Sequence, residues 1–129
     1  MPKKVYVIDG ANFTTLEGFW DEISDKLIPG VYWGRNLDAF NDILHGGFGT
    51  PEEGFILVWK NSALSRESLG HPETAEWYEE RTKKCHPSNV AHMKEGLKRA
   101  SKGEGPTLFD WLVEIITSED HGDIELRLE

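Results

Sequence analysis

The chain has 129 residues, of which 38% are hydrophobic, and this length suits one compact domain spanning residues 1–129. Its formal net charge of −9 disfavours a surface built to bind nucleic-acid phosphates and favours a basic protein partner. The lone cysteine, Cys85, excludes an intramolecular disulfide, and the lack of a signal-like or membrane-length apolar run predicts a cytoplasmic protein that contacts no membrane.

The N-terminal residues are predicted to form a strand followed by a helix. Residues 4–8 are rich in β-branched and aromatic side chains and run into a turn sequence. Thr14 and Glu17 have the spacing of a capping box, which predicts a helix start, and Pro29-Gly30 ends the pattern. The apolar residues at helical spacing between them are Leu16, Phe19, Trp20, Ile23 and Leu27.

The next predicted element is a short helix with two different faces. Asn36 is a good N-cap, and Gly46-Gly47 provides the left-handed conformation that favours a helix C-terminus. At about 100° per residue, one side of the helix is apolar and the other polar. The apolar side comprises Leu37, Phe40, Ile43 and Leu44, and the polar side comprises Asp38, Asn41, Asp42 and His45.

Residues 55–59 form an unbroken apolar run of strand length, which predicts a central strand covered on both faces. Near the C-terminus, Thr107 and Asp110 can cap a last helix that ends at Gly122. Residues 124–129 then alternate between apolar and charged side chains, as a half-covered edge strand does. Strands joined through helices favour a three-stranded parallel sheet of α/β type.

A helical insertion is predicted at roughly residues 60–106. Residues 72–84 form one predicted helix, with Pro72 at its first position, residues 88–100 a second, and residues 101–106 a linker. From Arg81 to Lys102 the chain has seven basic residues and one acidic residue, a net charge of +6 that leaves −15 elsewhere. The simplest interpretation of this basic stretch is the solvated side of added helices.

One segment of the chain resembles a known family. Residues 32–39, Tyr-Trp-Gly-Arg-Asn-Leu-Asp-Ala, followed by Asp42 and Leu44, are similar to the barstar family of intracellular ribonuclease inhibitors. The resemblance is densest over residues 28–59 and is poor over residues 60–106. It implies the barstar-like α/β fold, a three-stranded parallel sheet packed with helices, with the insertion placed before the last helix.

The resemblance also implies a partner and a set of contacts. The partner would be a basic extracellular or toxin ribonuclease, bound one to one and without a metal or other cofactor. Asp38 and Asp42 would enter its active site, although their spacing alone more often marks solvated helix positions. The implied partner-binding residues are Tyr32, Trp33, Gly34, Asn36, Asp38, Asn41, Asp42, His45 and Gly46.

Three features depart from the family pattern. Asn41 stands where a tryptophan commonly precedes the key aspartate, and His45 replaces a small hydroxyl residue. Phe48 takes the place of an aromatic residue after a one-residue shift. A late acidic residue also contributes in the family, and the candidates here are Glu114, Glu119 and Asp120.

Other functions are less well supported by the sequence. Cys85, His86, His92 and His71 lack the spacing of a zinc site. Asp38, Asp42 and His45 carry no accompanying nucleophile or metal-ligand motif, which disfavours a hydrolase. The main alternative is a regulatory module that binds RNA or an anionic protein through the basic insertion, and nucleic acid is disfavoured by the net acidity and by few neighbouring aromatics.

Overall fold

The computed structural model describes residues 3–46 and 48–129. Its sheet consists of strands β1 (Val5–Asp9), β2 (Ile56–Lys60) and β3 (Glu125–Leu128). Both pairings are parallel and β2 lies in the centre, which confirms the predicted α/β sheet. In this register Leu57 of β2 is paired with Tyr6 of β1 and with Leu126 of β3.

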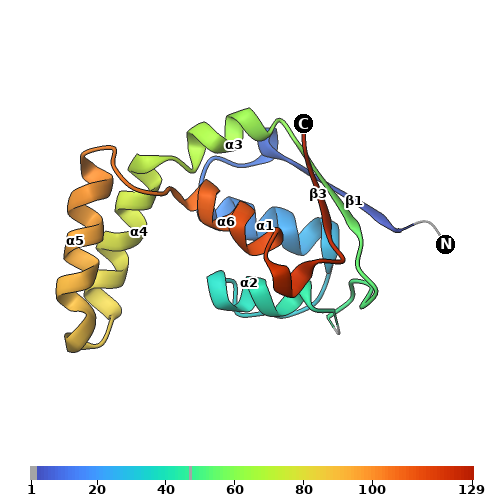
Figure 1. Ribbon diagram of the computed structural model, residues 1–129, viewed down its shortest axis with the longest axis horizontal. Helices are drawn as coiled ribbons and strands as arrows, with labels where there is room; N and C mark the ends of the chain where they lie inside the picture. The colour runs from blue at the N-terminus through green and yellow to red at the C-terminus, as the bar shows by residue number, and fades with distance from the viewer. Residues whose placement is uncertain (1–2, 47) are drawn as a thin grey trace.

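The helices lie on one side of this sheet (Figure 1). The helices are α1 (Leu16–Leu27), α2 (Leu37–Leu44), α3 (Ser62–Ser68), α4 (His71–Lys84), α5 (Val90–Ser101) and α6 (Leu108–Ile116). Short 3-10 turns occur at η1 (Gly10–Asn12), η2 (Pro87–Asn89) and η3 (Glu119–His121). No helix in the described ranges is long and apolar enough to span a bilayer.

The opposite face of the sheet is only partly covered, so the prediction that β2 is covered on both faces is wrong. Leu57 and Trp59 are fully buried, whereas Ile56 and Val58 are half-buried. The neighbouring Val5 remains 52% exposed. A continuous apolar run predicted two covered faces, but Val5, Ile56 and Val58 keep part of their apolar surface in solvent.

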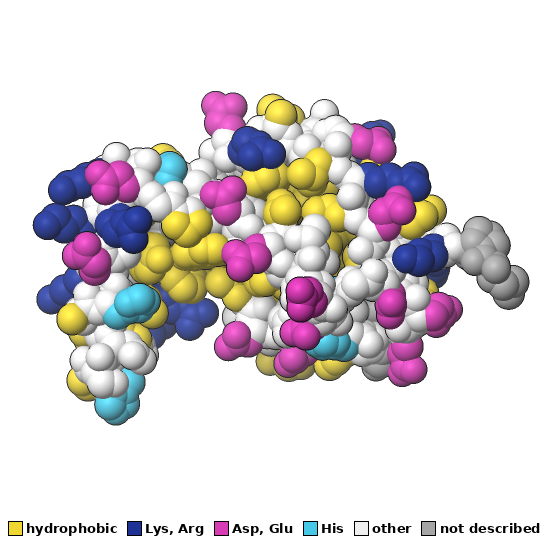
Figure 2. All heavy atoms as spheres, in the orientation of Figure 1, with side chains coloured by type: hydrophobic (Ala, Val, Ile, Leu, Met, Phe, Trp, Pro, Cys, Tyr) yellow, Lys and Arg dark blue, Asp and Glu magenta, His cyan; other side chains and the backbone are white. Residues whose placement is uncertain are grey.

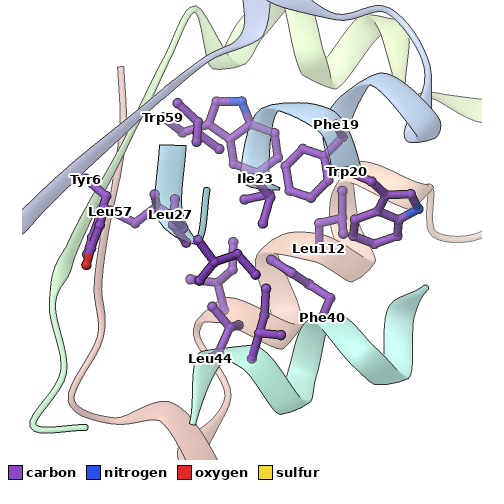
Figure 3. Close-up of a cluster of buried hydrophobic side chains, with 14 of the residues drawn as sticks. Tyr6, Phe19, Trp20, Ile23, Leu27, Phe40, Leu44, Leu57, Trp59 and Leu112 are labelled. Carbon is purple, nitrogen blue, oxygen red and sulfur yellow. The ribbon is translucent and has the colours of Figure 1, made fainter. Parts of the chain in front are cut away.

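An aromatic core joins the sheet to α1 and α2 (Figure 3). Phe19 of α1 stacks on Trp59 of β2 with ring centroids 5.2 Å apart, and it meets Phe40 of α2 edge-on at 5.5 Å. All three side chains are fully buried. Burying each ring contributes about 1.5–3 kcal/mol, so α2 has a firm attachment to the sheet.

The start of α1 differs from the prediction by one residue. Thr15 is the N-cap, and its hydroxyl oxygen accepts a hydrogen bond from the Gly18 amide at 3.0 Å. The capping box predicted from Thr14 and Glu17 is therefore wrong, because Thr15 has the extended backbone that the cap position requires. At α6 the predicted capping box between Thr107 and Asp110 is confirmed.

The insertion forms a helical hairpin of α4 and α5, which lie side by side at one end of the molecule (Figure 1). Both predicted helices are confirmed with small shifts, and Pro72 lies in the first turn of α4. Gly96 is required for the close packing, since a Cβ there would lie 2.3 Å from the Tyr78 ring. The preceding helix, α3, was not predicted from its serine-rich sequence.

The hairpin joins the rest of the molecule along a seam between α4 and α6. The Thr74 hydroxyl accepts a hydrogen bond from the Leu108 amide at 2.9 Å. Trp77 meets Trp111 edge-on, with ring centroids 5.2 Å apart, and Tyr78 contacts the same ring. One half of the predicted insertion is thus tied to the last helix through α4.

Candidate functional site

The segment before α2 is held in a defined conformation. The Asn36 side-chain oxygen accepts a hydrogen bond from the Ala39 amide at 2.8 Å, which confirms Asn36 as the N-cap. Gly34 lies close to this cap, because a Cβ there would lie 3.0 Å from the Cβ of Ala39. Arg35, between them, has a positive φ of 52° and pairs with Asp21 of α1. These contacts fix the chain as it enters the helix.

The two predicted faces of α2 are present in the structure. Phe40, Ile43 and Leu44 are buried in the core. Asp38 and Asp42 are exposed on the other side, one helical turn apart. Acidic side chains lie along the lower edge of the molecule in Figure 2, the region that α2 occupies in Figure 1. The buried face holds the helix in place and leaves these carboxylates accessible.

The two aromatic residues before α2 point in different directions. Tyr32 is 93% exposed, whereas Trp33 is only 5% exposed. The Trp33 indole donates a hydrogen bond to the Ser24 hydroxyl at 2.7 Å and meets Trp20 edge-on. Packing against α1 keeps the Trp33 ring in the core, and the predicted role of Trp33 in partner binding stays a prediction. Tyr32 retains a free surface for a partner.

Asn41 and His45 share an unexpected neighbour. The side-chain oxygen of Asn41 lies 2.7 Å from Nε2 of His121, in η3, which donates to it in the matching tautomer. The His45 and His121 rings lie 4.3 Å apart. No local sequence pattern indicates this role of His121, because 80 residues separate it from Asn41. Asn41 is half-buried, so it supports η3 as well as contributing to the polar face.

The environment of His121 disfavours its charged form. Burial lowers the pKa of this imidazole, the nearby His45 lowers it further, and Asp120 opposes the shift. His121 is 4% exposed, and its Nδ1 has no hydrogen-bond partner among the described residues. A proton at Nδ1 would therefore be buried without an acceptor among the described residues.

The end of α2 requires a glycine. Gly46 has a φ of 93°, and a Cβ there would lie 2.8 Å from a side-chain carbon of Glu52. The prediction of a left-handed residue after the helix is confirmed for Gly46, while Gly47 lies outside the described residues. Phe48, the proposed replacement for the family's aromatic residue, is 39% exposed.

The late acidic candidates fall into two places. Glu119 and Asp120 belong to η3, the turn that contacts α2 through His121, whereas Glu114 lies within α6. All three are exposed. Glu119 and Asp120 therefore share a turn with His121, the residue that contacts Asn41 of α2.

The described residues bring together no group of three His, Cys, Asp or Glu side chains that would hold a metal ion. His71 contacts the Gly105 carbonyl oxygen, and His86 contacts the Ser88 hydroxyl. The arrangement on α2 is instead an exposed set of anionic acceptors on a fixed helix. Such a surface suits recognition of cationic side chains, because arginine and lysine form short charge-assisted hydrogen bonds with carboxylates.

Comparison with known proteins points in the same direction. A family model described as "Barstar (barnase inhibitor)" matches residues 3–88, which include β1, α1, α2, β2, α3 and α4. The chain is also 42% identical over 64 residues to a Bacillus subtilis (strain 168) protein named "Putative ribonuclease inhibitor YrdF". That match covers 50% of this chain and 67% of the relative. The exposed residues of α2 lie within the part matched by the family model.

Proposed function

Because this chain belongs to the barstar family, we propose that it inhibits a basic ribonuclease by placing the polar face of α2 in the enzyme's active site. The observation that carries this proposal is the pair Asp38 and Asp42, exposed on a helix whose other side is buried. Their carboxylates present anionic oxygens to cationic groups that otherwise bind RNA phosphates. Inhibition follows because the occupied site cannot accept RNA.

The surrounding residues would extend this contact. Tyr32 offers an exposed ring next to the helix, and an aromatic anchor adds contact area at small cost in conformational entropy. His45 lies at the other end of the polar face, followed by Gly46. The segment 32–36 is already ordered by the Asn36 cap, so binding costs little further ordering.

This mechanism requires no chemistry by the inhibitor. The chain acts by binding alone, and one inhibitor molecule blocks one enzyme molecule. A cytoplasmic inhibitor of this kind would protect its host from a ribonuclease that is secreted or delivered as a toxin. Acidic steering suits such a role because opposite charges accelerate association.

A second candidate function rests on the hairpin. Basic side chains gather over α4 and α5 at the left of Figure 2, and residues 81–102 have a net charge of +6. This surface would bind RNA or an anionic protein. An RNA mobility shift at physiological salt tests this function. Micromolar binding that disappears on neutralising Lys94, Lys98 and Arg99 would favour RNA binding over ribonuclease inhibition.

The main proposal is tested by titrating barnase, the ribonuclease named in the family description, with the purified wild-type chain. We expect activity to fall linearly to near zero at one equivalent, as tight one-to-one binding requires. Full activity at a large excess of the chain would reject the proposed inhibition.

A further inference from the structure

A groove of about 450 Å³ opens beside the proposed contact face, where α4 of the insertion faces α1 and the start of α2. Its apolar walls include the half-buried side chains of Leu16, Leu37 and Trp77. Asn36, which caps α2, also lines it. The groove is therefore continuous with the segment that we expect to contact the ribonuclease.

Four carboxylates line this groove: Glu80, which pairs with Lys83 and Lys84, and the three of Glu17, Glu73 and Glu76. Burial raises the pKa of Glu73, and the neighbouring Glu76 and Glu17 raise it further, while a hydrogen bond from the Leu16 amide opposes the shift. Within the described part of the chain, none of the three forms an ion pair. Their mutual repulsion is left uncompensated.

Each cationic residue that lines the groove has a partner other than Glu17, Glu73 or Glu76. Arg35 pairs with Asp21, and the Arg81 guanidinium lies over the Trp77 ring, 5.0 Å from its centroid. Lys84 lies 3.9 Å from a carboxylate oxygen of Glu80. Among the described residues, Glu17, Glu73 and Glu76 are therefore the groove carboxylates that have no ion pair.

We propose that this groove is a second docking site for the inhibited ribonuclease, which inserts a surface loop carrying an arginine or lysine between α1 and α4. The inference rests on the proposed function, because it assigns the occupant to the same enzyme molecule. The aliphatic stem of the inserted side chain packs against the apolar walls, and its charged end meets the carboxylates.

Charge and position together favour this occupant. A basic enzyme already seated on α2 carries cationic side chains next to Asn36, where the groove begins. Insertion relieves the repulsion among Glu17, Glu73 and Glu76 and lowers the pKa of Glu73 in the complex.

Two charge-matched double variants test the groove. Glu17→Gln with Glu76→Gln removes two exposed groove carboxylates and preserves their size. Glu67→Gln with Glu79→Gln makes the same change in net charge at exposed positions outside the groove lining. The Kd and dissociation rate for barnase are measured for both variants and for wild type, and thermal unfolding confirms that each variant is folded.

We expect the groove variant to bind about tenfold more weakly, mainly through faster dissociation, and the control to change the association rate only slightly. Equal effects of the two variants would overturn the groove inference and leave inhibition through α2 intact. A wild-type chain that does not bind barnase would reject the proposed function and, with it, the groove.

Discussion

The helix α2 and the hairpin of α4 and α5 show two different ways of attaching a helix to the same fold. α2 buries Phe40, Ile43 and Leu44 in the central core, and its polar face is held in one orientation. In contrast, α5 buries only Ala100 among its 12 residues and packs against α4. A rigidly attached surface pays a smaller entropic cost on binding, which suits α2 as the main contact and the hairpin as an accessory.

A substitution on the polar face of α2 should cause the greatest loss of binding. Asp42→Ala should weaken barnase binding by about 2–5 kcal/mol or more, because enzyme cations are left desolvated and unpaired, and this range comes from the barnase and barstar complex itself. Stability should change by no more than about 0.5 kcal/mol, since Asp42 is exposed. Inhibition titrations and thermal unfolding of the variant measure the two quantities.

Asp38→Ala serves as the internal comparison for this prediction. It should cost less binding than Asp42→Ala, and it removes a first-turn carboxylate that interacts favourably with the helix dipole. Wild-type inhibition by Asp42→Ala would show that the proposed face is wrong. Early melting of that variant would show a structural role instead.

The second prediction concerns a substitution that destabilises the hairpin and leaves α2 unchanged. Gly96→Ala forces a methyl group into the Tyr78 ring and should destabilise the packing of α5 on α4 by about 1–3 kcal/mol. Glu95→Ala, at an exposed neighbouring position, is the matched control. Hydrogen exchange should increase in α5 for Gly96→Ala only, while inhibition through α2 persists. Unchanged exchange would contradict the close packing.

The third prediction concerns the support of α2 by His121. Its pKa is lowered in the folded protein by burial and by His45, so the unfolded chain binds more protons at mildly acidic pH. Stability should therefore fall as the pH drops below about 6.5, the ordinary histidine value. His121→Gln keeps a side-chain donor for Asn41 and cannot titrate.

Chemical unfolding at pH 7 and pH 5 measures this effect. The loss of unfolding free energy between the two pH values should be smaller in His121→Gln than in wild type. His92→Gln, an exposed change on α5, should behave like wild type. An identical pH dependence for all three proteins would exclude His121 as the cause.

The last prediction concerns long-range electrostatic attraction and its effect on the association rate. The net charge of −15 outside residues 81–102 should attract a basic enzyme, and salt screens such attraction beyond about 8–10 Å. The association rate with barnase should decrease as ionic strength rises, whereas the dissociation rate should change less. Stopped-flow measurements at several salt concentrations test this expectation, and a salt-independent association rate would count against steering.

The contrast between α2 and the hairpin of α4 and α5 also explains which features the sequence could predict. The division of α2 into two faces followed from local spacing, and the Asn36 cap and Gly46 follow from local backbone chemistry. The direction of the Trp33 ring depends on packing against Trp20, and no local pattern encodes it. The contact between Asn41 and His121 depends on how the last helix returns to α2.

The sequence could predict the two helices of the hairpin, but not where the hairpin packs in the fold. Helical spacing and Pro72 located α4, but its seam with α6 depends on Trp77 meeting Trp111, a contact across 34 residues of chain. The groove between α4 and α1 arises from this placement. Sequence could therefore suggest the acidic face of α2, while the second acidic surface required the three-dimensional structure.

Hydroxyl-radical footprinting of the chain, free and bound to barnase, tests most directly whether α2 carries the contact. Tyr32 is 93% exposed in the free protein, and His45 and His92 are exposed on α2 and α5, so all three report on their own surfaces. We predict that binding protects Tyr32 and His45 from oxidation and leaves His92 unchanged. Protection of His92 with Tyr32 and His45 still reactive would contradict this account.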